Sequence, residues 1–176
     1  MAKADLTPRD TERLCLRIMS LSDAPFLHKL MNSEKWIKNI GNTGVPTIED
    51  AQKYIQDKMD QNIWSKGFAN YLMIDRSLGR PVGTCSLHNR EGIDGFDIGC
   101  ALFPEFEKNG YAKEAVLSMI NLAFDNYHQV RVSAITSMTN TQSYVGLEKL
   151  GFIFKRLIKL PYSEGKMKLY QYNRKV

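Results

Sequence analysis

Short apolar runs, several of which alternate with polar positions, recur along the chain, and this pattern indicates β-strands. The first run, LCLRIM at 14–19, predicts a strand. Three more runs lie at 71–75, 82–88 and 95–103, with turn residues such as Gly79 between them. Strands joined by such short connections are expected to form an antiparallel meander.

Helical periodicity occupies the longer stretches between strands. One helix is expected after Ser22 or Asp23, and another begins in the TIED sequence at 47–50, which resembles a capping box. The clearest helix spans 110–127, where apolar residues recur every three or four positions. A shorter helix over 141–150 follows, and a glycine ends it.

Three further strands are expected at 130–135, 152–160 and 167–172, which completes the order β-α-α-β-β-β-α-β-α-β-β. One strand–helix–strand crossover, from Gly95 to Ile135, calls for a parallel pair and should be right-handed. This order predicts an α+β (mixed α/β) protein, with a central, mostly antiparallel twisted sheet flanked by about four helices.

Composition and charge exclude several classes of protein. With 43% hydrophobic and 24% charged residues, the 176-residue chain fits one globular domain, 1–176, whose polar first twelve residues are expected to be frayed. The net charge of +5 suits an anionic ligand, but the basic residues are scattered, so nucleic acid is not an expected partner. No apolar stretch is long enough to span a membrane, and no secretion signal is recognisable, so a cytoplasmic location is expected.

The cysteines give no sign of a metal site. Cys15, Cys85 and Cys100 are widely spaced, no C-x-x-C pair exists, and the three histidines are isolated. We therefore expect no bound metal and no disulfide framework, but reduced, buried thiols.

The chemistry-bearing stretch lies where the third meander strand leads into the long helix, from Asp97 to Ala115. Backbone N–H groups at a helix N-terminus are unpaired and favour an anion, and Gly110 lets a ligand approach the backbone closely. Lys108 and Lys113 add positive charge. The stretch suits a phosphate or diphosphate, although a glycine at a helix start is often only a turn, and neither a Walker loop nor a Rossmann fingerprint is present.

This stretch resembles the diphosphate loop of the GCN5-related N-acetyltransferases (GNAT), which reads Q/R-x-x-G-x-G/A; here EKNGYA occupies 107–112. A second block of the family, N-x-x-S followed by L-E-K-L-G-F, is matched by Asn140, Ser143 and the LEKLGF sequence at 147–152. The resemblance covers about 14–172 and is closest to the ribosomal-protein alanine N-acetyltransferases.

One residue departs from the family pattern. Glu107 stands where the family usually has Gln or Arg, and a carboxylate beside a diphosphate is repulsive. Lys108 and Lys113 are expected to offset this charge, so the departure bears on cofactor affinity and not on the fold.

The resemblance implies that acetyl-CoA binds in a V-shaped gap between the strands at 95–103 and 130–135. The residues that it implies for cofactor binding are Cys100, Ala101, Leu102, Glu107, Lys108, Asn109, Gly110, Tyr111, Ala112, Lys113 and Asn140. A backbone N–H among the first three would polarise the thioester carbonyl.

The resemblance also implies direct attack by a neutral amine on the thioester. Ser143 maps to the serine that protonates the leaving thiolate in this branch, and Asp97 lies where relatives often carry the base, acting directly or through water. The alternative for Asp97 is a solvated strand carboxylate without a catalytic role. Cys100 is interpreted as a structural residue and not as a nucleophile.

The sequence therefore predicts an acetyl-CoA-dependent N-acetyltransferase acting on a primary amine, either a protein N-terminus or a small molecule. A non-catalytic acyl-CoA-binding sensor or scaffold is the alternative. The acceptor cannot be read from the residues, and a homodimer through the final strands is left open.

Overall fold

The computed structural model describes residues 8, 10–58, 70–161 and 165–174. Its α-helices are α1 (Ala24–Met31), α2 (Glu34–Asn39), α3 (Ile48–Lys58), α4 (Tyr111–Asn121) and α5 (Thr141–Lys149). Shorter turns are the 3-10 helices η1 (Leu21–Asp23) and η3 (Pro104–Phe106) and the π-helical turn η4 (Leu122–Asn126). The strands are β1 (Leu14–Ile18), β2 (Asn70–Asp75), β3 (Arg80–His88), β4 (Phe96–Leu102), β5 (Arg131–Ser137), β6 (Ile153–Ile158) and β7 (Met167–Asn173).

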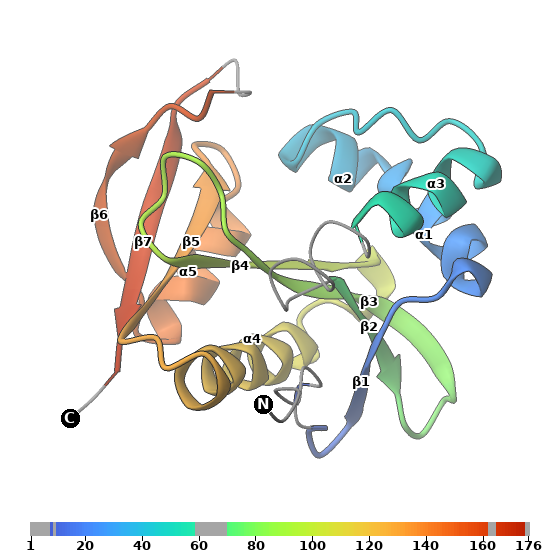
Figure 1. Ribbon diagram of the computed structural model, residues 1–176, viewed down its shortest axis with the longest axis horizontal. Helices are drawn as coiled ribbons and strands as arrows, with labels where there is room; N and C mark the ends of the chain where they lie inside the picture. The colour runs from blue at the N-terminus through green and yellow to red at the C-terminus, as the bar shows by residue number, and fades with distance from the viewer. Residues whose placement is uncertain (1–7, 9, 59–69, 162–164, 175–176) are drawn as a thin grey trace, which may run out of the picture.

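All seven strands belong to one sheet, in the order β1-β2-β3-β4-β5-β7-β6. Each neighbouring pair is antiparallel except β4 and β5, which are parallel, so the predicted mixed sheet with one crossover is confirmed. Figure 1 shows α1, α2 and α3 together on one side of the sheet and α4 on the other. No helix within the described ranges is both long and apolar enough to cross a membrane.

The parallel pair is very short, and this opens the sheet in the middle. Pairing between β4 and β5 is limited to Phe96 with Val132 and Asp97 with Ser133. Beyond these pairs the two strands separate, as Figure 1 shows, while β4 remains paired with β3 and β5 with β7. The result is the V-shaped gap that the sequence led us to expect, with Asp97 at its apex.

Two hydrophobic clusters hold the helices on either side of this opening. Residues of α4 such as Met119, which is fully buried, pack with β1–β5 in the larger cluster. Ala51 and Ile55 of α3 pack with α1 and with Leu72 of β2 in the second. Thus α4 is anchored to one face of the sheet, and α1 and α3 are anchored to the other (Figure 1).

Two helix ends follow the predicted capping chemistry. At the start of α3, Asp50 N donates to Thr47 Oγ1 at 3.1 Å and Thr47 N donates to Asp50 Oδ2 at 3.2 Å. At the end of α5, Gly151 adopts φ 94°, and the Gly151 and Phe152 N–H groups donate to the carbonyls of Glu148 and Leu147, each at 3.0 Å. These bonds satisfy the terminal carbonyls of α5.

Three details differ from the expected elements. The sequence pattern did not predict α2, a short helix whose start is capped by Ser33, the acceptor for the Trp36 N–H. The long helix is α-helical only to Asn121 and ends in the π-helical turn η4. Asp23 precedes α1, but its side chain accepts from Ser20 N and pairs with Arg17 instead of capping α1.

Candidate active site

Asp97 is a fully buried carboxylate at the apex of the opening, with 0% of its surface exposed. Its Oδ2 lies 3.2 Å from Arg90 Nε, and apart from this ion pair neither oxygen has a hydrogen-bond partner among the described residues. Burial raises the pKa of Asp97 to about 6, while the charge of Arg90 acts in the opposite direction. The alternative of a solvated strand carboxylate is therefore wrong.

Polar side chains of β3 lie beside Asp97 on the same face of the sheet. His88 is the strand partner of Asp97, and its Nε2 is hydrogen-bonded to Ser86 Oγ at 2.7 Å. Burial lowers the pKa of His88 to about 3, so this ring is neutral at neutral pH. Ser86 and His88 also fill the space over Gly99, where a Cβ atom would lie 2.7 Å from Ser86 Oγ. Arg90 and Asp97 thus form an ion pair beside the neutral Ser86 and His88, and the charge of Lys58 also acts on His88.

The strand edge that faces β5 is free beyond Asp97. Cys100, Ala101 and Leu102 pair with β3 on one edge, and no partner strand covers the other edge in the described residues. Of the three cysteines expected to be buried, Cys85 is buried, Cys15 is half-buried and Cys100 is exposed, the last because β5 has already parted from β4. Desolvation by the surrounding protein atoms still raises the pKa of Cys100 to about 12.

The loop before α4 contains two residues in the left-handed region and leads directly into the N-terminus of that helix. Lys108 and Gly110 adopt φ 60° and 86°, while Glu107 is extended at φ −72° and ψ 163°. Gly110 is the N-cap of α4. The N–H groups of Tyr111, Ala112 and Lys113 belong to the first helical turn, which has no carbonyl partners within the helix.

Arg13 of the segment before β1 flanks this loop. A Cβ atom at Gly110 would lie 2.8 Å from Arg13 Nη2, so the glycine leaves room for the guanidinium. Arg13 pairs with Glu114 of α4 and lies 4.8 Å from the centre of the Tyr111 ring. The Tyr111 hydroxyl donates to Asp75, so its side chain is turned away toward β2 and only its backbone belongs to the loop surface.

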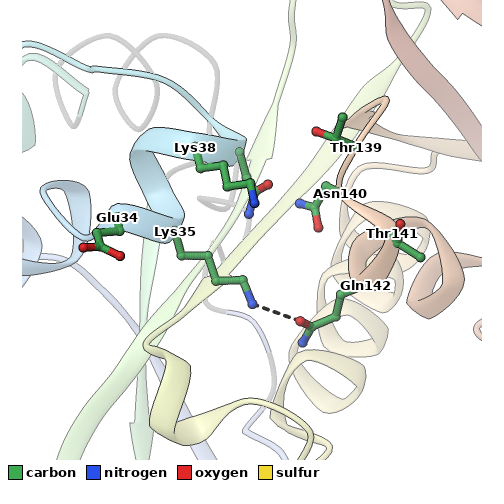
Figure 2. Close-up of a pocket in the computed structure, with 8 residues that line it drawn as sticks. Glu34, Lys35, Lys38, Thr139, Asn140, Thr141 and Gln142 are labelled. Carbon is green, nitrogen blue, oxygen red and sulfur yellow. Dashed lines mark hydrogen bonds between the residues drawn. The ribbon is translucent and has the colours of Figure 1, made fainter.

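Glu107, the residue that departs from the family pattern, is not an isolated charge. Its carboxylate forms an ion pair with Lys35 of α2 and accepts a hydrogen bond from Gln142 Nε2 at 3.1 Å. Lys35 Nζ also donates to Gln142 Oε1 at 2.9 Å, the bond dashed in Figure 2. Lys35, and not the expected Lys108 or Lys113, therefore neutralises Glu107.

A cavity of about 430 Å³ separates α2 from the first turn of α5 (Figure 2). Its lining residues are Glu34, Lys35, Lys38, Asn39, Thr139, Asn140, Thr141 and Gln142. Asn140 both lines the cavity and caps α5, because its Oδ1 accepts a hydrogen bond from Ser143 N at 3.3 Å. Ser143 is half-buried in the same first turn, directly after the lining residues.

The predicted site residues thus lie on the elements that border one opening: β4, the loop before α4, and the first turn of α5. Lys35, Arg90 and His88 were not singled out from the sequence. Lys35 meets Glu107 from 72 positions away, whereas His88 and Arg90 lie close to Asp97 in the sequence and are brought to it by the pairing of β3 with β4; no local motif signals any of them. In the part of the chain that the structure describes, no three His, Cys, Asp or Glu side chains are grouped to hold a metal ion.

Comparison with known proteins gives the family. A family profile described as "Acetyltransferase (GNAT) domain" matches residues 13–153. The uncharacterized N-acetyltransferase p20 of Bacillus licheniformis is 29% identical over 161 residues, which cover 90% of this chain and 89% of that protein.

Solved structures share the fold over almost the whole chain. A GNAT-family acetyltransferase from Bacillus anthracis has a TM-score of 0.76 at 24% identity, with 93% of this chain and 96% of that chain covered. RimL, a ribosomal-protein acetyltransferase in complex with coenzyme A, has a TM-score of 0.78 at 18% identity, with 94% and 97% covered. The profile match over most of the chain, together with the split sheet and the loop before α4, shows that this protein belongs to the GNAT family of acetyltransferases.

Proposed function

We propose that the protein transfers the acetyl group of acetyl-CoA directly to a primary amine in the opening between β4 and β5. This proposal depends mainly on the burial of Asp97 at the apex of the opening. Its carboxylate is fully buried there, and Arg90 is its one ion-pair partner among the described residues. A carboxylate kept only for structure would be expected to have its oxygens satisfied by hydrogen bonds.

Asp97 is suited to remove the proton of the attacking amine. With its pKa raised to about 6 it is ionised at neutral pH, yet it is a stronger base than an exposed aspartate. The amine nitrogen bonds to the thioester carbon, the C–S bond breaks, and the amine proton passes to Asp97 directly or through water.

Ser143 is suited to pass a proton to the leaving thiolate, and its hydroxyl regains a proton from water. It lies in the first turn of α5, where Asn140 fixes the helix start and the positive end of the helix dipole favours a developing negative charge. A backbone N–H on the free edge at Cys100, Ala101 or Leu102 would stabilise the oxyanion. The Cys100 thiol, with a pKa of about 12, is protonated at neutral pH and so is a poor nucleophile, which supports direct transfer.

The residues present fit the proposed cosubstrate. The backbone N–H groups of residues 108–113 would hold the diphosphate, with Arg13, Lys108 and Lys113 nearby as positive charges; the Glu107 N–H, also expected there, already donates to the Pro104 carbonyl at 3.2 Å. Asn140 and the free edge of β4 would contact the pantetheine arm, which can add to a strand edge by backbone hydrogen bonds.

The acceptor that fits best is a neutral or acidic primary amine, such as the N-terminus of a peptide. Lys38 lines the cavity next to Ser143 and forms no ion pair with the described residues, and its charge disfavours a polycationic acceptor, whereas the charge of Lys35 is balanced by Glu107. RimL, which shares this fold, is described as an alpha-N-protein acetyltransferase.

The test is an acceptor panel with acetyl-CoA as donor. Peptides with free neutral or acidic N-termini are compared with polyamines, and the same peptides with blocked N-termini serve as matched controls. We expect CoA release with free N-termini and one added acetyl group in the product by mass spectrometry. If the protein binds acetyl-CoA but no amine of a broad panel causes release of CoA, the sensor alternative is favoured.

A homodimer through the final strands stays a prediction. β6 lies at the edge of the sheet and exposes Ile153, Phe154 and Leu157, which would suit contact with a second copy. Light scattering coupled to size-exclusion chromatography would show whether the mass is that of one chain or two.

A further inference from the structure

Three residues from distant segments meet at the mouth of the opening: Lys35 of α2, Glu107 after η3, and Gln142 of α5. The Lys35 ammonium contacts both of the others, and Gln142 donates to the second carboxylate oxygen of Glu107. Figure 2 shows the Lys35 side chain extending from α2 toward the first turn of α5. The Lys35 ammonium is thus held beside Glu107, the first residue of the loop that precedes α4.

The charges at this point need a cation. Glu107 is 15% exposed, and its negative charge lies at the start of the loop assigned to the diphosphate. Lys35 cancels that charge in the free protein. An ammonium has three N–H donors, and the contacts with Glu107 and Gln142 account for two of them. One donor remains, and it can bind a phosphate oxygen without breaking either contact.

We propose that Lys35 is a ligand for the diphosphate of acetyl-CoA, and that Glu107 and Gln142 position its ammonium before the cofactor arrives. This inference rests on the proposed function. Glu107, which alone would repel the diphosphate, thereby becomes the residue that places a cation there. The proposed contact between Lys35 and the diphosphate would also hold α2 against the loop before α4. This bears on the acceptor side of the site, because α2 lines the cavity next to Ser143.

The closest control is Lys38, one helical turn further along α2. It lines the same cavity and forms no ion pair with the described residues. General electrostatic attraction would be weakened equally by the loss of either lysine. A positioned ligand predicts that only the loss of Lys35 matters strongly.

Affinity for CoA and for pantetheine, which lacks the diphosphate, is measured by calorimetry in four variants and the wild type. Lys35→Met should weaken CoA binding about tenfold to a hundredfold, as expected for a charge-assisted hydrogen bond, and leave pantetheine binding unchanged. Lys38→Met should change CoA affinity less than about threefold.

Lys35→Met also leaves Glu107 unpaired near the diphosphate, so the double variant decides between the two causes. If Lys35 is a ligand, Lys35→Met/Glu107→Gln still binds CoA about tenfold more weakly than Glu107→Gln alone. If Lys35 only neutralises Glu107, these two variants bind CoA equally, and the inference is overturned.

Failure of the inference and failure of the proposed function give different results. A wild-type protein that does not bind CoA overturns the proposed function together with the inference. A wild-type protein that binds CoA, with Lys35→Met changing only the KM for the acceptor, overturns the inference alone.

Discussion

Replacing Asp97 with asparagine should make the protein more stable at neutral pH while impairing its activity. The folded protein raises the pKa of Asp97 from 3.8 to about 6 by burial, so folding disfavours the ionised form. At about 1.4 kcal/mol for each pKa unit, this costs about 3 kcal/mol of stability once the carboxyl is ionised in both states.

The sign of the pH dependence follows from the direction of the pKa change. Below about pH 3 the carboxyl is protonated in both the folded and the unfolded protein, and burial of the neutral acid incurs no such cost. As the pH rises from about 3 to about 7, the unfolded state loses its proton first, and stability falls by about 3 kcal/mol. Asp97→Asn carries no titrating group at this position and escapes this loss.

The assay is urea unfolding of the wild type and of Asp97→Asn at several pH values from about 3 to about 8. The difference in free energy of unfolding between the two proteins isolates Asp97, because the other titrating groups cancel. We expect it to shift by about 3 kcal/mol in favour of Asp97→Asn across this range, or about 2–4 °C in Tm for each kcal/mol. The attraction between Arg90 and the ionised Asp97 is already contained in the pKa of about 6, so it adds no separate contribution to this pH dependence.

Asp94→Asn is the matched control, because Asp94 lies just before β4 with 90% of its side chain exposed. Its difference from the wild type should vary much less with pH, since an exposed ion pair contributes little. A difference for Asp97→Asn that stays flat from about pH 3 to about pH 8, or that favours the wild type increasingly as the pH rises, would refute the reasoning.

Three further substitutions test the site. Ser143→Ala should lower kcat roughly 10²- to 10⁴-fold in steady-state assays with little change in CoA affinity by calorimetry, and an unchanged kcat would remove Ser143 from the reaction. Gly110→Val should lower Tm and abolish CoA binding, because valine is strained at φ 86° and its Cβ would displace Arg13; Gly146→Ala, with open space around it, should do neither. Cys100→Ala should retain most activity, whereas an acetylated enzyme found by intact mass spectrometry would contradict direct transfer.

Features set by short stretches of sequence were predictable. The capping box at Thr47 and Asp50, the glycine that ends α5, and the strands on either side of Gly79 each depend on residues a few positions apart. The family motifs placed the loop at Gly110 and the start of α5 at Asn140 in the same way. Local hydrogen bonding and side-chain sterics determine such features, so a single sequence carries them.

Features that depend on distant contacts could not be predicted. α2 is only six residues long and has no buried stripe, so its periodicity is too weak to recognise. The pairing of Glu107 with Lys35 joins residues 72 positions apart, and the sequence suggested nearer lysines as partners. The burial of Asp97 and its contact with Arg90 arise from the register of β3, β4 and β5, which alternation alone does not fix.

The most direct test of the account is the pH dependence of kcat/KM for an amine acceptor, in the wild type and in Asp97→Asn. If Asp97 takes the amine proton, the wild-type profile falls on the acid side with a pKa near 6, the same value that governs its stability. In Asp97→Asn the rate is lower and this limb is absent, while any limb set by the amine itself remains. An acid limb near pH 6 with the same shape in both proteins would contradict the account.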